Sequence, residues 1–520
     1  MGAGNALVDS PLRLDEQIVH YLMGNCSLDE RLLRLGAIRQ ASEVLVASHR
    51  ALATALAQNW VIASTEQRSL PMLQIWGRDR GTLGAIAATT CQLLSVELWA
   101  MTAETLPTEP AQLQLIRDLW NREWQLNRRV LLLRCDTMGR QTPERDWAIA
   151  HLSDTLNAPL ILTTQERRAA TQRPQVTVEV PTPTTQEQRQ VWEEHLTTFN
   201  VSFNGTIDTL VAHFNLSRSS IQEVCNIARS ANQTDLLPTL WNACRNYSRP
   251  QLDLLAQRIH ASATWEDLVL PEKEQKVLQE IAAHVRQRFK VYEQWGFSGK
   301  GQRGLGISAL FAGASGTGKT LAAEILGHAL NLDVYRIDLS AIVSKYIGET
   351  EKNLRQIFDV AEEGGVVLLF DEADALFGKR TEVKDSHDRY ANQEVSYLLQ
   401  RMEAYRGLAI LTTNLKNSLD QAFLRRIRFV IQFPFPDATQ RAEIWRRVFP
   451  PQAPIADLDY TKLARLNVAG GNIRNIALNA AFLAAEADEA IAMKHLLQAS
   501  RSEYIKLERP LTDTEVKGWV

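Results

Sequence analysis

Glycines, a lysine and a hydroxyl occur at phosphate-binding spacing in the segment Gly313-Ala-Ser-Gly-Thr-Gly-Lys319-Thr320. The glycines lack a Cβ, so successive backbone N–H groups can turn inward around a phosphate. Lys319 can then reach the β- and γ-phosphates of a nucleotide, and the Thr320 hydroxyl can ligate Mg²⁺. An apolar run from Ala309 to Ala312 precedes the segment and an Ala/Leu-rich helical pattern follows it. That context is typical of a P-loop and argues against the alternative, a glycine-rich turn without function.

A pair of carboxylates follows the apolar run Val366-Val-Leu-Leu-Phe370, which ends in Asp371 and Glu372. A buried strand that delivers two carboxylates at its C-terminal end is the Walker B arrangement. Asp371 can hold Mg²⁺ through water, and Glu372 can polarise the attacking water as general base. The predicted metal ligands are Thr320 and Asp371. The predicted nucleotide-binding residues are Gly313, Ala314, Ser315, Gly316, Thr317, Gly318, Lys319, Thr320, Leu321 and Asp371.

Further polar residues downstream fit the same chemistry. Asn414 ends another apolar strand and can orient the lytic water beside a γ-phosphate. Arg425, Arg426 and Arg428 lie near the end of a predicted helix, where they either cap that helix or act as an arginine finger on a neighbouring subunit. Arg474 begins a later helix and could touch the phosphate from within its own subunit. The predicted catalytic set is therefore Glu372, Asn414, Arg425, Arg426, Arg428 and Arg474.

The composition bounds what carries this chemistry. With 520 residues the chain is too long for one core, so two to four domains are expected. A formal net charge of −3 gives no general attraction to nucleic acid or to an anionic membrane. The five cysteines are scattered, which favours reduced thiols and a cytoplasmic location. No run approaches the roughly 20 apolar residues that span a bilayer, so no membrane association is expected.

The two halves of the chain share a series of landmarks. Gly77 and Gly313 lie 236 residues apart, as do Val130 and Val366. Further pairs keep the same order at offsets of 249 to 253: Thr163 with Thr412, Pro181 with Pro434, Trp192 with Trp445 and Ile221 with Ile473. This order predicts two copies of one α/β module, each with a parallel sheet, flanking helices and a helical lid. The alternative is that the earlier segment is an unrelated α/β domain.

The first copy lacks the chemistry of the second. At the ungapped offset, the phosphate lysine, the metal-binding hydroxyl and the metal-binding carboxylate fall on Leu83, Gly84 and Cys135, and Arg474 corresponds to Gln222. We therefore predict a first module that binds no nucleotide. The predicted domains are a helical N-terminal segment (1–65), the degenerate module (66–260), the catalytic P-loop domain (261–436) and the helical lid (437–520).

Taken together, these motifs resemble the AAA family of ATPases over the predicted catalytic domain and lid, in the family's order. The resemblance implies ATP and Mg²⁺ as cofactors, ATP hydrolysis, and a homo-hexameric ring, because the finger must come from the next subunit. In the family a double arginine after a leucine usually supplies the fingers, which implicates Arg425 and Arg426. Counting from Asn414 without a gap indicates Arg428 instead. Many members have a second arginine finger. The corresponding position in this chain is Ile431, which departs from the family pattern.

The segment from Ser344 to Lys352 resembles the first pore loop of protein-remodelling AAA members. There an aromatic–aliphatic pair projects into the ring channel and grips an extended polypeptide. The resemblance implies that Lys345, Tyr346 and Ile347 contact a polypeptide client, since a flat apolar side chain grips without regard to sequence. The alternative is that Tyr346 packs inside its own subunit.

A narrower resemblance rests on Gly378-Lys-Arg, on the stretch from Asp385 to Asn392, and on Gly471-Asn-Ile-Arg-Asn-Ile-Ala-Leu-Asn-Ala-Ala. It is to the ATPases encoded with bacterial phage-tail-like extracellular contractile injection systems, and implies a role in assembling or remodelling the particle. Two other functions remain open: a nucleic-acid translocase or loader, which the near-neutral charge disfavours, and an ATP-gated scaffold with little hydrolysis.

Overall fold

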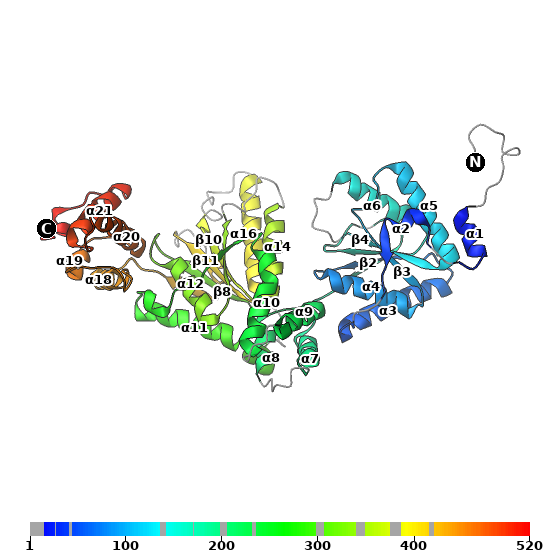
Figure 1. Ribbon diagram of the computed structural model, residues 1–520, viewed down its shortest axis with the longest axis horizontal. Helices are drawn as coiled ribbons and strands as arrows, with labels where there is room; N and C mark the ends of the chain where they lie inside the picture. Colours follow the sequence, from blue (N-terminus) through cyan, green and yellow to red (C-terminus); the bar gives the residue numbers. More distant parts are fainter. Residues whose placement is uncertain are drawn as a thin grey trace. The chain divides into compact units, whose positions relative to one another are not determined.

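The computed structural model describes residues 15–25, 28–40, 44–135, 142–169, 171–197, 205–230, 236–297, 306–339, 349–374, 386–414 and 421–519. The chain divides into two compact units, which are described separately. The first comprises residues 1–203 and 216–230, and the second comprises residues 204–215 and 231–520. In Figure 1 most of the first unit is coloured blue to cyan, its last helices are green, and the second unit is mostly green to red.

The described part of the first unit contains a six-stranded sheet in the order β1-β3-β4-β5-β2-β6. Five strands are parallel, and β1 pairs antiparallel with β3. The central strands are buried on both faces, which explains their near-continuous apolar sequences. The strands are β1 (Gly36–Ile38), β2 (Met72–Trp76), β3 (Glu97–Thr102), β4 (Arg129–Arg134), β5 (Leu160–Thr164) and β6 (Gln175–Glu179).

Helices cover both faces of this sheet. Figure 1 shows α3 and α4 on one face and α5 and α6 on the other, and two separate hydrophobic clusters fill these layers. The helices are α1 (Glu16–Leu22), α2 (Glu30–Leu33), α3 (Ala47–Thr65), α4 (Arg80–Leu93), α5 (Pro110–Asn127), α6 (Pro143–Thr155), α7 (Thr185–Leu196) and α9 (Arg218–Ser230).

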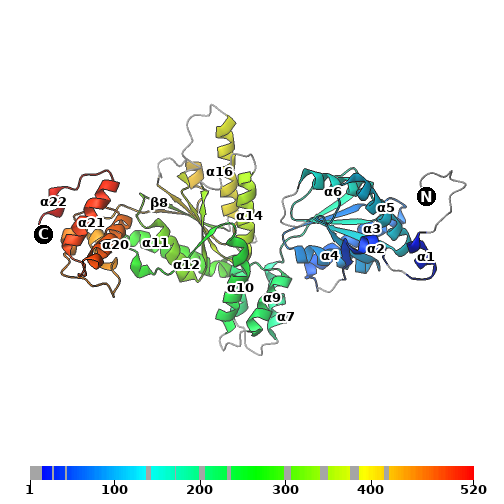
Figure 2. The same ribbon diagram turned by 45° about the horizontal axis from the view of Figure 1, so that its top comes forward.

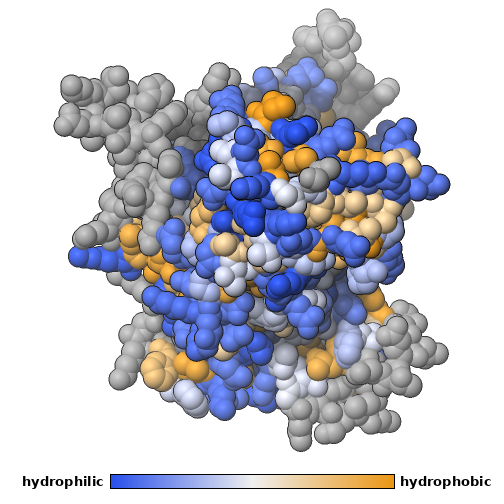
Figure 3. Space-filling view, turned by 90° about the vertical axis from the view of Figure 1, so that its left-hand side faces the viewer, coloured by the Kyte–Doolittle hydropathy of each residue, from blue (hydrophilic) through white to orange (hydrophobic). Residues whose placement is uncertain are grey.

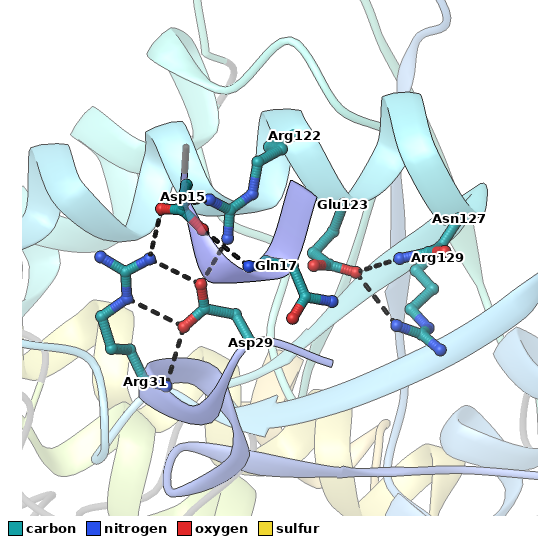
Figure 4. Close-up of polar contacts among 8 residues, drawn as sticks. All are labelled: Asp15, Gln17, Asp29, Arg31, Arg122, Glu123, Asn127 and Arg129. Carbon is teal, nitrogen blue, oxygen red and sulfur yellow. Dashed lines mark hydrogen bonds and ion pairs between the residues drawn. The ribbon is translucent and has the colours of Figure 1, made fainter. Parts of the chain in front are cut away.

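A network of ion pairs ties the N-terminal segment to α5 (Figure 4). The side chain of Asp29 is only 5% exposed and accepts hydrogen bonds from Arg31 and Arg122. Asp15 also pairs with both arginines, at 3.3 and 3.0 Å. The bonds from Arg31 hold the pKa of Asp29 well below its usual range. The N-terminal segment is therefore part of the first unit.

The described part of the second unit holds a six-stranded sheet in the order β12-β8-β11-β10-β9-β7. Five strands are again parallel, and β7 pairs antiparallel with β9. The strands are β7 (Gln257–Ile259), β8 (Ile307–Ala312), β9 (Val334–Asp338), β10 (Val367–Asp371), β11 (Leu408–Thr413) and β12 (Phe429–Gln432).

The helices of the second unit flank this sheet and form a separate C-terminal cluster, seen in Figure 2. Those near the sheet are α8 (Thr206–His213), α10 (Leu236–Leu252), η2 (Trp265–Asp267), α11 (Glu272–Phe289), η3 (Lys290–Gln294), α12 (Lys319–Leu330), α14 (Glu349–Gly364), α16 (Ser386–Ala404) and α17 (Gln421–Leu424). The cluster, which we call the lid, comprises α18 (Ala438–Arg447), α19 (Tyr460–Leu463), α20 (Gly470–Glu486), α21 (Met493–Lys506) and α22 (Asp513–Val516).

The two sheets have equivalent strand orders, each with one antiparallel strand beside the edge of the parallel set. This confirms the predicted fold class of tandem modules with parallel sheets and flanking helices. The expectation of helix throughout residues 1–65 was wrong at Gly36–Ile38, which form β1. Helix α3 also packs in the same hydrophobic cluster as β2 and α4. We therefore propose that the first module begins near Gly36 rather than at residue 66.

The helices that follow β6 are divided between the two units. Helices α7 and α9 belong to the first unit, whereas α8 and α10 belong to the second. Trp241 of α10 donates from Nε1 to the carbonyl of Asn331 at 2.8 Å, and Arg249 donates to both carboxylate oxygens of Asp333 at 2.8 and 3.0 Å. We propose that the boundary between the first and second modules lies within this helical region rather than at residue 260.

Within the described ranges, every helix is too short or too polar to cross a bilayer. On the face drawn in Figure 3, hydrophobic side chains lie in separate patches among hydrophilic ones. The lid itself exposes Leu478, Phe482 and Ile505.

Candidate functional site

The loop between β8 and α12 has a backbone that only glycine accommodates at several places. Gly316 and Gly318 have φ angles of 75° and 97°, in the left-handed region. A Cβ on Gly313 would clash with the carbonyl oxygen of Phe433. Gly318 is the N-cap of α12, so the helix begins at Lys319 with its N–H groups facing the loop. This is the geometry that a phosphate group requires.

The Lys319 side chain lies within this loop. Its Nζ donates to the carbonyls of Gly313 and Ala314 at 2.7 and 2.9 Å, and to Oδ1 of Asn414 at 2.9 Å. Burial lowers the pKa of Lys319, while the carboxylates at the end of β10 oppose this effect. The contact with Asn414 brings the end of β11 against the P-loop.

The end of β10 presents the two predicted Walker B carboxylates. Asp371 accepts a hydrogen bond from the hydroxyl of Thr412 at Oδ1 and pairs at Oδ2 with Nη2 of Arg336, at 2.7 Å. Glu372 is exposed and has a φ of 56°, an unusual backbone for a non-glycine residue. Such strain clusters at functional sites. It turns the Glu372 side chain away from the regular strand geometry.

Two residues here had no predicted role. Asp374 accepts from the hydroxyl of Thr413 and, at 3.0 Å, from the backbone N–H of Asn414. It therefore fixes the end of β11 that carries Asn414. The signal in the sequence was that Asp374 adds a third carboxylate to Asp371 and Glu372. Arg336, on the neighbouring strand, gave no comparable signal because register between strands is not visible in sequence.

The lid reaches the P-loop through the first turn of α20. The backbone N–H of Gly471 donates to the carbonyl of Gly316 at 2.9 Å, and a Cβ on Gly471 would lie 3.1 Å from the Cα of Gly316. Arg474, one turn further along α20, is exposed and lies close enough to Glu324 of α12 to oppose the rise in pKa that burial causes there. The structure thus brings the predicted Arg474 to the side of the nucleotide loop.

The donor set fits a nucleotide with a bound cation. Thr320 supplies a half-buried hydroxyl beside the loop, and Asp371 supplies a half-buried carboxylate at the adjacent strand end. Oxygen donors of this kind are those that Mg²⁺ prefers. The left-handed glycines leave the loop interior free of Cβ atoms for phosphate oxygens.

Comparison with protein families identifies two segments. Residues 309–436 match the model described as "ATPase family associated with various cellular activities (AAA)". The chain contains an AAA ATPase domain. Residues 184–250 match the "Contractile injection system ATPase helical domain". Both resemblances drawn from the sequence are therefore confirmed, and the second match falls on the helices α7 to α10 that are divided between the two units.

Curated relatives match the AAA domain. An "Uncharacterized AAA family ATPase y4kL" of Sinorhizobium fredii is 34% identical over 185 residues, covering 35% of this chain and 53% of the relative. The "26S proteasome regulatory subunit S10B homolog B" of Arabidopsis thaliana is 32% identical over 211 residues (38% and 53%). The "Proteasome-activating nucleotidase" of Methanosarcina mazei is 31% identical over 200 residues (36% and 48%). The chain spans about half the length of these relatives.

The three predicted finger arginines of the AAA domain differ in their contacts. Arg426 donates to both carboxylate oxygens of Glu403, at 2.5 and 3.1 Å, which raises the pKa of Arg426. Arg428 donates to the hydroxyl of Tyr292 at 2.5 Å. Arg425 is exposed, and its side chain has no hydrogen bond or ion pair among the residues that the structure describes. Arg426 and Arg428 would have to exchange these partners to reach another subunit.

The predicted pore-loop residues Lys345, Tyr346 and Ile347 lie outside the described residues. Their structural placement therefore stays a prediction.

In the first module the loop after the central strand is shorter. Three residues (77–79) separate the end of β2 from the start of α4, whereas six residues (313–318) separate the end of β8 from the start of α12. Arg80 is therefore the first helical residue, in the place of Lys319. The ungapped assignment of Leu83 and Gly84 to the phosphate lysine and metal-binding hydroxyl was wrong, because it ignored this shortening.

An aspartate fills the helix N-terminus that this shorter loop leaves. Asp79 is the N-cap of α4 and accepts from the backbone N–H of Gly81 at 3.0 Å and from the hydroxyl of Thr82 at 2.6 Å. The hydroxyl of Ser219, at the start of α9, also donates to it at 3.4 Å. A carboxylate of the chain thus takes the donors that a phosphate would need.

The sheet register also corrects the place of the Walker B aspartate in the first module. The last residues of β2 and β8 pair with the last residues of β5 and β11, so these strand ends are equivalent. Counting across to β4 and β10 brings Arg134, not Cys135, to the place of Asp371. Arg134 pairs with Thr163, as Asp371 lies beside Thr412. A cation therefore stands where the second module has the carboxylate that we predict to bind metal.

Proposed function

We propose that the chain is an ATP-hydrolysing, protein-remodelling AAA ATPase whose single nucleotide site lies in the second module. The observation that carries this proposal is the contact of Lys319 with Asn414, which joins the P-loop to the end of β11 beside the β10 carboxylates. Polar groups from three elements thus converge where the γ-phosphate of a P-loop nucleotide lies. The lid contact at Gly471 closes the same site from another direction.

Each residue has a distinct task in this proposal. Lys319 turns from the loop carbonyls to the β- and γ-phosphates. Glu372 accepts a proton from the attacking water, and Asn414 orients that water. Mg²⁺, held by Thr320 and Asp371, neutralises phosphate charge when it is bound.

We propose that the arginines complete this site in trans within a homo-hexameric ring. A finger must approach the γ-phosphate of a neighbour, and the exposed Arg425 has no bond to another described residue that would have to break first. Mixing Arg425→Ala/Arg426→Ala subunits with Lys319→Ala subunits should restore partial hydrolysis, because each supplies what the other lacks. Rings shown to mix without any recovery would return these arginines to a structural role.

The client is proposed to be a polypeptide, in the setting of a contractile injection particle. The relatives named for the proteasome and the helical domain named for contractile injection systems support this class. The net charge of −3 disfavours the rival nucleic-acid translocase. Cys91 and Cys225 are buried free thiols, and they support the proposal of a reducing, cytoplasmic location.

Steady-state hydrolysis measured alone, with an unfolded protein and with DNA distinguishes the candidates. Stimulation by protein supports the remodeller, stimulation by DNA supports the translocase, and slow hydrolysis with tight ATP binding supports the scaffold. Tyr346→Ala should keep basal hydrolysis but lose protein stimulation, whereas Tyr346→Phe should retain both. A joint loss of melting temperature and hydrolysis in Tyr346→Ala would instead identify a packed core residue.

A further inference from the structure

Arg336 contacts the Walker B aspartate from the neighbouring strand. It lies on β9 opposite Leu369 of β10, two residues before the end of the strand. Its Nη2 lies 2.7 Å from Oδ2 of Asp371. The Arg336 side chain is 41% exposed, and the Asp371 side chain is 14% exposed. A positive charge is therefore placed at the carboxylate that is also the proposed metal ligand.

The partners of Asp371 differ in their freedom to leave. Oδ1 accepts from the hydroxyl of Thr412, a residue that is 1% exposed, and from the backbone N–H of Glu372 at 3.2 Å. Both donors are fixed by the sheet. Oδ2 is held by Arg336, a long and partly exposed side chain. Oδ2 is therefore the oxygen that can change partner, and Arg336 is the partner that can move.

We propose that Arg336 competes with Mg²⁺ for Asp371 and thereby sets how much Mg²⁺ the nucleotide site requires. This inference rests on the proposed nucleotide site. A guanidinium does not lose its proton in a protein, so Arg336 stays charged. When Mg²⁺ binds, the Arg336 side chain must either leave Asp371 or remain close to the metal. Either outcome weakens the binding of a second cation at the same carboxylate. Arg336 is thus a positioning residue that acts on the metal through Asp371.

The test measures binding of a fluorescent ATP analogue to the full chain at graded concentrations of free Mg²⁺. In Arg336→Gln and Arg336→Met the half-saturating Mg²⁺ concentration should fall roughly tenfold, the size of effect that a nearby charge has on an ionic equilibrium. Arg336→Lys keeps the charge and should stay near the parent value. Arg355→Gln is the matched control, because Arg355 is 40% exposed and faces Asp359 on α14 at 3.7 Å.

An unchanged or higher Mg²⁺ requirement in both neutral variants would overturn the inference. Loss of the melting transition in both variants would also overturn it, since Arg336 would then be needed for folding. Binding of the same analogue is also measured in EDTA. Binding by the parent chain then distinguishes a failure of the proposed nucleotide site from a failure of the proposed role of Arg336. A parent chain that binds no analogue under any condition defeats the proposed function, whereas normal parent binding with no change in the variants defeats only the role of Arg336.

Discussion

The two modules share one sheet topology but differ where the central strand meets its helix. In the second module the connecting loop has six residues (313–318), and the last of them, Gly318, is the N-cap of α12. In the first, the three residues Gly77–Asp79 lead to an aspartate N-cap. The comparison teaches that buried strands specify this fold and that the loop alone decides whether the helix N-terminus remains available to an anion.

A second difference lies two strands away in each sheet, at the ends of β4 and β10. Arg134 replaces the carboxylate of Asp371, so the local charge is inverted. Ala100 stands opposite Leu132 where Arg336 stands opposite Leu369, so the partner cation has no counterpart. Both halves of the phosphate and metal chemistry are therefore absent from the first module, as far as its described residues show.

The strongest test of this comparison is Lys319→Ala. Because the P-loop then lacks its lysine, and we propose no second site in the first module, nucleotide binding should fall from one per chain to none. Isothermal titration of the full chain gives both stoichiometries. Two sites in the parent, or one site remaining in the variant, would show that the first module binds nucleotide after all.

The next largest effect should come from Glu372→Gln. Losing a general base slows catalysis by about 10²- to 10⁴-fold, while the P-loop and Asp371 still bind nucleotide. Hydrolysis and analogue binding measured on one preparation separate the two properties. Normal turnover in this variant would remove Glu372 from the proposed role of base.

A smaller effect concerns the helices divided between the units. His213 of α8 is buried against Trp241, and burial, aided by Arg288, lowers its pKa to about 3. A neutral buried histidine stabilises the fold fully above the unfolded pKa of about 6.5, and this contribution is lost as pH falls. Linkage gives about 1 kcal/mol per pH unit below that value.

The pH dependence is measured by thermal melts between pH 7 and 5. His213→Phe should flatten the loss of melting temperature on acidification, because Phe cannot take up a proton. The matched control is His151→Phe, since His151 also contacts a tryptophan, Trp147, in the first unit. Equal pH profiles for the parent chain and the His213 variant would exclude this histidine as the source.

The smallest expected effect is that of Asp79→Ala. Removing an N-cap costs about 1 kcal/mol, so the first unit should melt a few degrees lower. Hydrolysis should not change, because Asp79 belongs to the module without a nucleotide site. Asp437→Ala, which removes the corresponding kind of cap from α18 in the lid, is the control. A gain of nucleotide binding in Asp79→Ala would contradict the comparison, since it would mean that the carboxylate, and not the shorter loop, blocks the first module.

Local patterns predicted much of the second module. The glycines of the P-loop, the apolar run before Asp371 and the strand end at Asn414 each carry their own short-range signal, and the structure brings them together. Strand register has no such signal, which is why Arg336 was missed and why the counterpart of Asp371 was assigned to Cys135 instead of Arg134. The shortened loop before Arg80 was invisible for the same reason, because an ungapped count cannot show a deletion.

Longer-range organisation was harder to predict. The strand Gly36–Ile38 is too short to display a period, and its pairing partner lies about sixty residues further along the chain. The division of α7 to α10 between two units follows from contacts such as Arg249 with Asp333. Those contacts join residues 84 positions apart, beyond the reach of any local pattern.

The shorter loop of the first module also bears on its evolutionary history. A lost lysine can return by a single substitution, but a missing half of a loop cannot. Restoring a phosphate cradle between β2 and α4 would require inserting residues and removing the Asp79 cap together, and neither change alone gives a site. The proposed loss of nucleotide binding would therefore be protected against point mutation, which would leave the rest of the first module free to diverge as a surface for other contacts.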